Sequence, residues 1–595
     1  MLRAMTSYAT LPLRLVWQPA DTEQVIVGGG TAGLAVASRL SQYMPDDCIL
    51  VLEAGPAALE EPNINIPGKK GSTLGTKYDW NFTTIAQPAA DGRIFSVNRG
   101  KVLGGSSALN LMTYDRGAMA DYDAWEELGN PGWNWRNMYA AMERAEDWQS
   151  QDGQYVNPGV GEGGPIEALI NRVIPPQQGG FIPALVSLGV PNNNYSLAGN
   201  NIGVMTQPSN ILASNYTRSY APTYLWTVAG QNLQVIINTT VSKLVLDSCN
   251  GTIKATGVDI GGQIISATKE VILSAGSVQS PQLLELSGIG PDSVLSAAGI
   301  QVVLDLPGVG ENFQDHLRIQ NSYQLKPEYP SFDELRYNAT YAAEQLALYE
   351  ANETSEYDYT GSGYAYITWD QALGNDSALI KLARDSADPD NVVDQKKLSY
   401  YAGNSSRTVP QLEVIFSDGY TGAAGYPANG STEYGDKFFT LIAVIQHPFA
   451  RGSIHINATA PSGHPVIDPN YLSKPYDLQA VVDAAKFNRK IAQTSSLRTY
   501  WTTEHEPGLN ITTDEQWLAF AKNTTLSIYH PMGTCAMLPK NESGVVDANL
   551  LVYGTSNLRV VDASIIPIQP SGHLQTMVYG VAERAARIVS DRWLS

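Results

Sequence analysis

The sequence is short of cysteine, and this shortage excludes two classes of protein. Its three cysteines, Cys48, Cys249 and Cys535, are too few and too far apart for a disulfide framework or a zinc site, and at most one bridge could form. We expect Cys48, at the start of a strand, and Cys535, in an apolar run, to be core residues. No metal centre is predicted.

Long apolar runs and an excess of basic residues are also missing. No segment approaches 18 uninterrupted apolar residues, so no membrane span is predicted. The 38 Lys and Arg against 58 Asp and Glu give a net charge of −20. Nucleic-acid binding requires clusters of Lys and Arg and is therefore not expected. At 595 residues the chain is too long for one simple core, so two or three interleaved domains are expected.

The chain is rich, by contrast, in acceptor sites for N-glycans. Fourteen Asn-x-Ser/Thr sequons occur from Asn81 to Asn541, where composition alone would give roughly five. This excess predicts a glycoprotein that is secreted or enters the secretory pathway or cell wall. Residues 1–18 do not contain the apolar core of a signal peptide because Arg14 interrupts it, so an intracellular protein is the alternative.

The motif with the clearest chemistry is QVIVGGGTAG at residues 24–33. Residues 25–27 are typical of a buried parallel strand, and Gly28, Gly30 and Gly33 have the G-x-G-x-x-G spacing. Only glycine lets the backbone turn this sharply and approach a pyrophosphate, whose charge then faces the amides of the following helix. The motif predicts a dinucleotide site, and an ordinary tight turn is the alternative.

A second strand, CILVLEAG, places Glu53 20 residues after Gly33. A carboxylate at this position can accept hydrogen bonds from ribose hydroxyls and would repel a 2′-phosphate. The unit therefore predicts a site for FAD or NAD(H) rather than NADP.

Residues 99–117, RGKVLGGSSALNLMTYDRG, contain a second glycine turn at Gly104 and Gly105. We expect the chain to enter a helix there through Ser106 and Ser107, which are suited to capping the helix and to binding phosphate. A capped helix without a ligand is an equally good interpretation.

The remaining segments predict two kinds of sheet. Residues 270–290 are typical of a third strand, turn and helix of a doubly wound sheet. Between residues 320 and 450, Tyr-rich polar stretches alternate with strand-like runs such as FFTLIAVIQHPF. We predict a mostly antiparallel sheet with flanking helices there, as the place for a substrate pocket.

Several longer stretches carry a resemblance to a known family. GKVLGGSSALN at 100–110, GSVQSPQLLELSGIG at 276–290, and HPMGTCAM, VVDASIIP and GHLQT near the C-terminus resemble the glucose–methanol–choline family of FAD oxidoreductases. The resemblance implies an α/β fold, in which a doubly wound Rossmann-like FAD-binding domain is interleaved with an α+β substrate domain on a mostly antiparallel sheet. It implies a mainly FAD-binding region at 23–325, a mainly substrate-binding region at 326–526, and a segment at 527–590 that returns to the FAD domain.

The resemblance also implies FAD contacts at named positions. They are Gly28, Gly30, Thr31, Ala32 and Gly33 in the first turn, Glu53 at the ribose, Ser106, Asn110, Leu111 and Thr113 along the pyrophosphate and flavin, Val241 near the adenine, and Asp562, Ala563 and Gln575 beside the flavin. Members with covalently attached flavin have a histidine near the GGSS turn. No histidine precedes His316 here, so noncovalent FAD is expected.

Two of the seven histidines, His530 and His573, match the family's catalytic positions. Alcohol oxidation requires removal of the hydroxyl proton and transfer of the α-hydrogen as hydride, which FAD would accept at N5. A histidine suits the proton transfer because its pKa is near neutrality. By resemblance, His530 is the general base, and His573 hydrogen-bonds the substrate oxygen. A structural role is the alternative for either residue.

The residues before His530 bear on the substrate. Leu526, Ile528 and Tyr529 stand where glucose oxidases carry polar residues for sugar hydroxyls, and TTLSIYHP is similar to the aryl-alcohol-oxidase branch. A buried site rejects a polyol whose hydroxyls find no partner. We therefore expect a primary benzylic, allylic or furanic alcohol, including intermediates of fungal secondary metabolism handled by enzymes similar to patulin synthase, and an aldehyde or lactone product.

Three functions remain open from the sequence. The first is an oxidase that passes electrons to O2 and releases H2O2, with protonated His530 stabilising superoxide. The second is an alcohol or sugar dehydrogenase that uses a quinone-type acceptor. The third is a non-catalytic flavin-binding relative, which the presence of both histidines disfavours.

Overall fold

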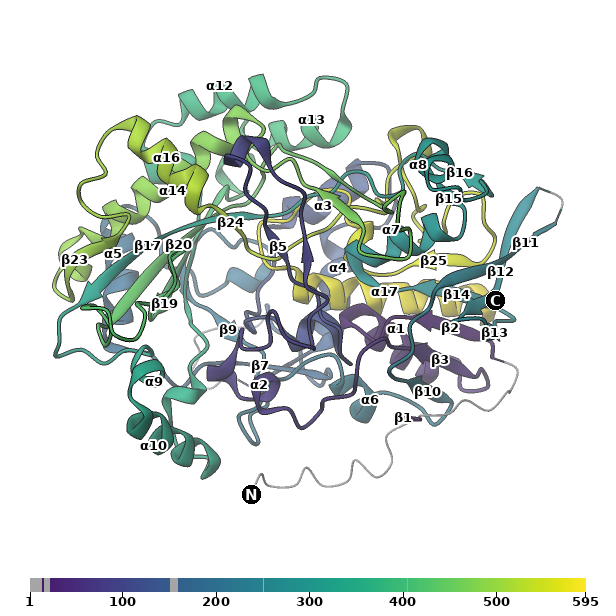
Figure 1. The fold of residues 1–595 in the computed structure, drawn as a ribbon, viewed down its shortest axis with the longest axis horizontal. Helices are drawn as coiled ribbons and strands as arrows, with labels where there is room; N and C mark the ends of the chain where they lie inside the picture. The colour runs from purple at the N-terminus through teal and green to yellow at the C-terminus, as the bar shows by residue number, and fades with distance from the viewer. Residues whose placement is uncertain (1–12, 15–21, 150–158, 250, 404, 595) are drawn as a thin grey trace.

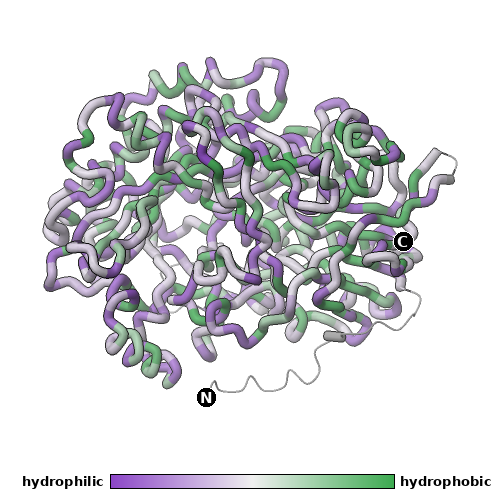
Figure 2. The backbone as a smooth tube through the Cα atoms, viewed as in Figure 1, coloured by the Kyte–Doolittle hydropathy of each residue, from purple (hydrophilic) through white to green (hydrophobic). Residues whose placement is uncertain are grey.

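The computed structural model describes residues 13–14, 22–149, 159–249, 251–403 and 405–594. The candidate leader at residues 1–18 lies almost entirely outside them, as do the sequons at Asn250 and Asn404. Two large sheets dominate the described part of the chain, a parallel one in the right half of Figure 1 and an antiparallel one in the left half. Apolar stretches, green in Figure 2, run through the strands of both sheets.

The parallel sheet has the strand order β1-β10-β3-β2-β14-β25. Every residue of its central strands β3 (Ile49–Leu52), β2 (Gln24–Val27) and β14 (Glu270–Leu273) is buried, as expected for parallel strands covered on both faces. The chain leaves β2 towards β3 on one side and returns as β14 on the other, which opens a crevice at the carboxyl ends of the strands. The outer strands are β1 (Leu13–Arg14), β10 (Leu233–Ile236) and β25 (Leu558–Val560).

Helices from both ends of the chain complete this half. Helix α1 (Thr31–Tyr43) follows β2 and packs against α17 (Leu574–Leu594), which also contacts α4 (Trp135–Ala145). The buried residues of α1 include Leu34, Ala37 and Leu40, and burial of each leucine contributes about 1.5–3 kcal/mol. The C-terminal helix is therefore part of the N-terminal nucleotide fold. Helix α7 (Gly276–Leu286) follows β14.

The antiparallel sheet has the order β18-β19-β20-β17-β23, and β24 also pairs with β17. Directly paired residues point to the same face of a sheet, so the ladder register defines rows of side chains. One row is Tyr366, Glu413, Val444 and Arg318, and the next is Tyr364, Ile415, Ile442 and Gln320. The strands are β17 (Leu317–Leu325), β18 (Gly363–Ile367), β19 (Leu412–Asp418), β20 (Phe438–Ile445), β23 (Trp501–Glu506) and β24 (Leu526–Ser527).

Shorter elements surround the two sheets. The further helices are α2 (Pro62–Asn65), α3 (Met119–Glu127), α5 (Phe181–Ser187), α6 (Thr223–Thr227), α8 (Asp292–Ala297), α9 (Glu334–Tyr337), α10 (Ala339–Glu350), α11 (Trp369–Leu373), α12 (Ser377–Ser386), α13 (Val392–Ser399), α14 (Pro475–Ala492), α15 (Ser495–Arg498) and α16 (Asp514–Thr524). The further strands are β4 (Phe82–Thr83), β5 (Ser96–Val97), β6 (Glu146–Trp148), β7 (Ile166–Ile170), β8 (Gly203–Thr206), β9 (Pro208–Ser209), β11 (Lys243–Cys249), β12 (Thr252–Asp259), β13 (Ile264–Ser266), β15 (Ile289–Gly290), β16 (Leu304–Asp305), β21 (Ser453–His455) and β22 (Val466–Asp468).

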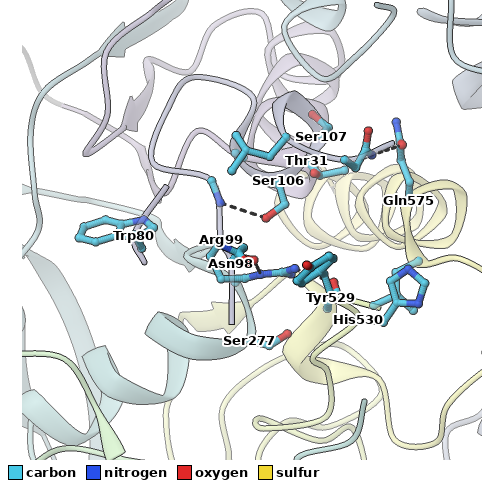
Figure 3. Close-up of a pocket in the computed structure, with 18 of the residues that line it drawn as sticks. Thr31, Trp80, Asn98, Arg99, Ser106, Ser107, Ser277, Tyr529, His530 and Gln575 are labelled. Carbon is cyan, nitrogen blue, oxygen red and sulfur yellow. Dashed lines mark hydrogen bonds between the residues drawn. The ribbon is translucent and has the colours of Figure 1, made fainter. Parts of the chain in front are cut away.

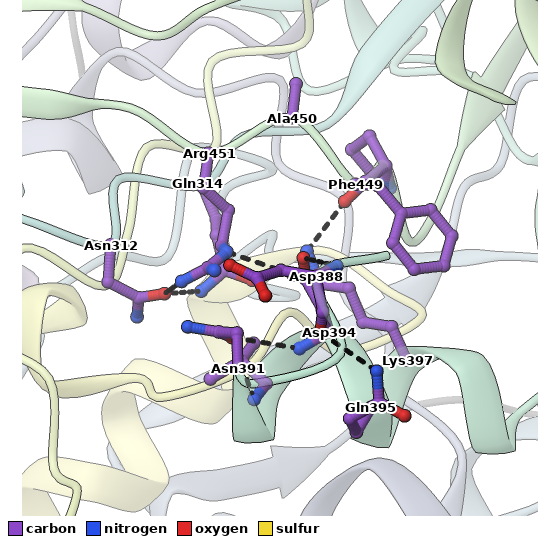
Figure 4. A network of polar contacts seen from close by, with 12 residues as sticks. Asn312, Gln314, Asp388, Asn391, Asp394, Gln395, Lys397, Phe449, Ala450 and Arg451 are labelled. Atoms are coloured by element: carbon purple, nitrogen blue, oxygen red, sulfur yellow. Dashed lines mark hydrogen bonds and ion pairs between the residues drawn. The ribbon is translucent and has the colours of Figure 1, made fainter. Parts of the chain in front are cut away.

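A polar network joins segments that are far apart in the sequence (Figure 4). Arg451 bonds Asp394 through Nε at 3.1 Å and Asn312 through Nη1 at 3.1 Å. The buried Lys397 donates to the carbonyl of Pro448 at 2.6 Å and to Gln569 at 3.2 Å. The network therefore fixes α13 to the end of β20 and to the segment that leads into α17.

The predicted fold class is confirmed, because the chain combines a parallel sheet covered by helices with a mainly antiparallel sheet. The predicted boundary at residue 325 falls at the end of β17, which pairs with β20 in the antiparallel sheet. The domain bounds stay a prediction. No helix in the described ranges is long and apolar enough to cross a membrane.

Two local predictions were wrong. Ser106 and Ser107 do not begin an α-helix but lie in a single 3-10 turn, Gly105–Ala108, without a side-chain cap. Gly104 precedes that turn and has a φ of 98°, in the left-handed region. The tight turn brings this segment close to the first glycine motif. Cys535 is buried as expected, whereas Cys48 is only partly buried.

Candidate active site

A cavity of about 730 Å³ lies between the two sheets. Its lining comes from the glycine turn and α1, from the 98–113 segment, from the antiparallel sheet and from the C-terminal segment that carries both candidate histidines. Figure 3 shows Thr31, Ser106 and Gln575 on one side of this space and Tyr529 and His530 on the other. The segments that the motifs singled out therefore meet in one place.

Two glycines of the turn, Gly28 and Gly33, are packed too closely for a side chain. A Cβ on Gly28, whose φ is +104°, would lie 2.4 Å from the carbonyl oxygen of Ser274, and a Cβ on Gly33 would lie 1.9 Å from that of Gly28. Gly33 is not part of the cavity lining, so its role is packing. The second turn touches the first, because a Cβ on Gly105 would lie 2.7 Å from Cα of Gly30.

The N-terminus of α1 opens into the cavity. Its N-cap, Gly30, provides no side-chain acceptor, and the first turn of the helix has no acidic residue. Gly30, Thr31 and Ala32 all line the cavity. Amides in this position, at the positive end of the helix dipole, suit a pyrophosphate.

Glu53 lies beside the turn and is held by two backbone amides. Its carboxylate accepts from the amide of Gly29 at 2.8 Å and from that of Gly55 at 2.7 Å. Burial raises the pKa of Glu53 to about 7. Because Glu53 lines the cavity, its remaining acceptor capacity suits ribose hydroxyls.

The other predicted FAD contacts fall into two groups. Ser106, Asn110, Leu111, Thr113, Val241, Ala563 and Gln575 line the cavity. Asp562 also lines it, but its carboxylate already accepts from the amides of Gly276 and Ser564 and from the hydroxyls of Ser280 and Ser564. Asp562 therefore fixes the start of α7. A glycine cradle, an open helix end and a buried acid together fit FAD.

The two candidate catalytic histidines face each other. The rings of His530 and His573 are 4.9 Å apart between centroids and nearly perpendicular, at 84°. His573 lies one residue before α17, and His530 follows the short strand β24. Their positions thus depend on both halves of the fold.

Two carboxylates hold His573. Its Nδ1 lies 2.7 Å from Oδ2 of Asp115 and 3.6 Å from Oε1 of Glu413, and the Tyr366 hydroxyl donates to Asp115 at 2.5 Å. Burial opposes a charge on the imidazole, but Asp115 and Glu413 outweigh it and raise the pKa of His573 to about 9. His573 is therefore an imidazolium at neutral pH, with Nε2 left to donate. Asp115, Glu413 and His573 are close enough together to bind a metal cation. The positive charge of the imidazolium takes the place of such a cation beside the two carboxylates.

His530 has the opposite environment. Its Nδ1 lies 2.9 Å from Nδ1 of His316, and burial, with the neighbouring His573, His316 and Arg99, lowers its pKa well below the ordinary value. Burial also lowers the pKa of His316 to about 3, so that ring stays neutral. If His316 accepts a hydrogen from Nδ1 of His530, then Nε2 of His530 is free to accept a proton.

The backbone before His530 is strained. Tyr529 has a φ of +67°, in the left-handed region that tyrosine rarely adopts. Its carbonyl accepts a 2.5 Å hydrogen bond from Arg99, and its amide donates to Ser527 at 2.8 Å. The amide of His530 in turn donates to Asp315 at 2.9 Å. These contacts hold the strained turn that presents the His530 ring to the cavity.

The antiparallel sheet forms the opposite wall. Tyr364, Ile415 and Ile442, one row of the sheet, line the cavity together with Ile528 and Tyr529. Of the three predicted substrate-pocket residues, Leu526 does not line the cavity. It pairs with Arg318 in the ladder between β24 and β17, and its assignment to the substrate pocket stays a prediction.

The sequence analysis missed the residues that support the two histidines. His316 ends the loop LPGVGENFQDH, Asp115 lies in the stretch 99–117 that contains the second glycine turn, and Glu413 lies in the otherwise apolar strand LEVIFSD. An acid inside an apolar strand is a signal that could have indicated Glu413. The sequence did not show which of the two imidazoles each of these side chains would contact, since only the fold brings them together.

Comparisons with known proteins agree over most of the chain. Residues 22–318 and 448–582 match the two family models described as GMC oxidoreductase. The GMC oxidoreductase family protein Mala s 12 of Malassezia sympodialis is 35% identical, over 95% of this chain and 92% of the relative. A dehydrogenase of Armillaria gallica is 33% identical, over 94% and 92%.

Solved structures have the same fold. An FAD-dependent oxidoreductase from Chaetomium thermophilum superimposes with a TM-score of 0.85 at 30% identity, over 96% of this chain and 100% of that one. A fungal aryl-alcohol oxidase gives a TM-score of 0.83 at 27% identity, over 97% and 100%. The cavity between the sheets is thus set in a fold that relatives use for FAD-dependent oxidation.

A single methyl group tests the role of the glycine turn. We expect Gly33→Ala to lose most of its bound flavin, because the added Cβ would lie 1.9 Å from the Gly28 carbonyl and must move the turn. The flavin-to-protein absorbance ratio after purification measures the loss. Gly179→Ala is the matched control, since no atom lies within 4 Å of the Cβ built there. Equal flavin content in both variants would contradict the assigned packing.

Proposed function

Because this chain belongs to the glucose–methanol–choline oxidoreductase family, FAD enzymes that act on CH–OH donors, we propose that it oxidises a primary benzylic, allylic or furanic alcohol with O2 as the electron acceptor. The observation that carries the proposal is the pair of imidazoles, 4.9 Å apart, whose pKa values are shifted in opposite directions. Paired groups with separated pKa values are suited to acid and base roles in one step.

The two histidines divide the work on the substrate hydroxyl. Neutral His530 accepts the hydroxyl proton at Nε2, since its Nδ1 is engaged with His316. Protonated His573 donates from Nε2 to the same oxygen and stabilises the negative charge that develops there, while Asp115 holds Nδ1. FAD, when bound, supplies the acceptor for the α-hydrogen as a hydride.

The wall of the cavity supports an apolar alcohol over a sugar. Ile415, Ile442 and Ile528 offer no hydrogen bonds, and a polyol would bury hydroxyl groups without partners against them. Tyr529 and Tyr364 present aromatic surface, and the Tyr364 ring lies 5.9 Å from that of His573. Such a wall suits a flat ring that carries a hydroxymethyl group.

The acceptor has a second candidate. Relatives include proteins described as dehydrogenases as well as an aryl-alcohol oxidase, so a quinone-type acceptor is the alternative to O2. Release of H2O2 in air, in the amount of alcohol consumed, supports the oxidase; turnover only with an added quinone supports the dehydrogenase.

Secretion and glycosylation are a further part of the proposal. Of the twelve sequons in the described residues, ten have an exposed asparagine, and Asn215 and Asn457 are partly exposed. We expect the protein from a eukaryotic host to lose several kilodaltons of apparent mass on endoglycosidase treatment. An unchanged mass would remove the argument for the secretory pathway.

The role of His530 is tested by removing its imidazole. We expect His530→Ala to keep FAD but to reduce it at least about 100-fold more slowly than the wild type. Because we propose noncovalent binding, acid should release this FAD in full. Anaerobic stopped-flow reduction by benzyl alcohol measures the rate. His455→Ala is the control, since that ring is partly exposed and bonded to Glu285 and Glu311 outside the cavity. Near-normal reduction in His530→Ala would refute the assignment.

The charge on His573 predicts a pH dependence. Above about pH 9 the imidazolium loses its Nε2 proton, because Asp115 retains the hydrogen on Nδ1, and the substrate oxygen then has no donor. We expect flavin reduction to fall above about pH 9, and the fall to move to lower pH in Asp115→Asn, which removes the largest contribution that raises this pKa. Asp115→Glu should restore the profile in part. An unshifted profile in Asp115→Asn would contradict the proposed charge state.

A further inference from the structure

Arg318 places a cation on the wall of the cavity that faces the substrate. It lies on β17 in the same row as Glu413, and therefore on the face of the sheet that supports His573. It lines the cavity together with Tyr529 and Ile442. Nothing in the proposed proton transfer uses it.

The guanidinium of Arg318 lacks an acidic partner. Its Nε donates to the carbonyl of Ser527 at 3.2 Å, and its centre lies 5.7 Å from the Tyr529 ring. Among the described residues no carboxylate lies within 4 Å of it, whereas Arg336, which lines the same cavity, has Asp333 at 3.4 Å. Arg318 is partly buried, and desolvation lowers its pKa. A partly desolvated cation without a counter-charge is stabilised by a ligand that supplies one.

Lys70 is a further basic residue in the lining of the cavity, and burial lowers its pKa to about 7. Its amine bonds the Thr360 carbonyl and lies 4.7 Å from the Tyr359 ring. Asp418, which also lines the cavity, has a pKa that burial raises to about 8, so it is mostly neutral at pH 7. The lining therefore offers a permanent cation at Arg318, although the chain as a whole carries −20.

We propose that the alcohol substrate carries a carboxylate and that Arg318 binds it while the hydroxymethyl carbon lies between His530 and His573. This inference rests on the proposed function. The planar guanidinium presents paired N–H donors that match a carboxylate. Arg318 is on β17 and Glu413 is on β19, and these two strands are two strand spacings apart, roughly 10 Å. One aromatic or furan ring can span the space between these two side chains.

The overall negative charge does not oppose this contact. Charges on the outer surface act through water and are screened within about 8 Å at physiological salt, whereas a partly buried guanidinium acts at contact distance. Net charge therefore affects the rate of approach more than the affinity of the bound acid.

The test compares an acid with its neutral ester. The probes are 4-(hydroxymethyl)benzoate and its methyl ester, used in anaerobic flavin reduction by the FAD-loaded enzyme. We expect the wild type to prefer the acid in kcat/KM, and Arg318→Gln to lower the acid-to-ester ratio by about 10- to 100-fold, as for loss of a charge-assisted hydrogen-bonded pair. Arg318→Lys, which keeps the charge without the paired donors, should restore the ratio in part.

Arg336→Gln is the matched control, because Asp333 already neutralises that arginine; its ratio should stay within about twofold of the wild type. A wild-type preference for the ester, or an unchanged ratio in Arg318→Gln, would overturn the inference. Reduction of flavin by neither probe nor benzyl alcohol would instead overturn the proposed function. If Arg318→Gln does not fold, the binding of benzoate and of benzamide to the wild type is compared by titration, followed by the flavin absorbance. The inference requires benzoate to bind more tightly than benzamide.

Discussion

The contact between Asp115 and the imidazole of His573 is the constraint on which the site depends. Two histidines with similar surroundings would share one proton between them and could not act as separate acid and base. Asp115 and Glu413 raise the pKa of His573 to about 9, whereas burial against cationic and neutral neighbours lowers that of His530. One ring is therefore charged and the other neutral at the same pH, and each can act on the same substrate oxygen.

The fold maintains this difference by bringing each ring its own partners. Glu413 comes from β19 and Asp115 from the segment after the second glycine turn, and both reach a ring at the start of α17. His316 reaches His530 from the residue before β17. The left-handed Tyr529 and the contacts of its neighbours keep His530 turned towards the cavity. Rigid strands and a long helix thus set the spacing of the rings, as precise chemistry requires.

The two sheets contribute unlike surfaces to one cavity. The parallel sheet supplies a turn of glycines and an open helix end that suit a pyrophosphate. The antiparallel sheet supplies a row of apolar and aromatic side chains, with Arg318 at its margin. This contrast sets the orientation of the substrate. A flat alcohol packs against the apolar and aromatic row, and a charged group at the far end of the alcohol binds Arg318.

Much of this protein can be predicted from the sequence, because local rules decide it. The strand, glycine turn and helix that begin at residue 24 and the acid at Glu53 follow from spacing and apolar period, and the sheet types follow from run length and polarity. The signature stretches also indicate FAD and the two histidines. Even there, the helix expected at Ser106 proved to be a single 3-10 turn, since packing of Gly105 against Gly30 overrides the local preference.

Only the tertiary structure decided which groups set the charge of each ring. Asp115 and His573 are 458 positions apart, and His316 and His530 are 214 apart, so no local pattern joins them. The surroundings of Arg318, which has no carboxylate within 4 Å among the described residues, likewise depend on segments that only the fold brings together. The sequence by itself determined which chemical groups this protein has; the fold decided their pKa values and partners, because electrostatic interactions depend on distance and burial in space and not on separation along the chain.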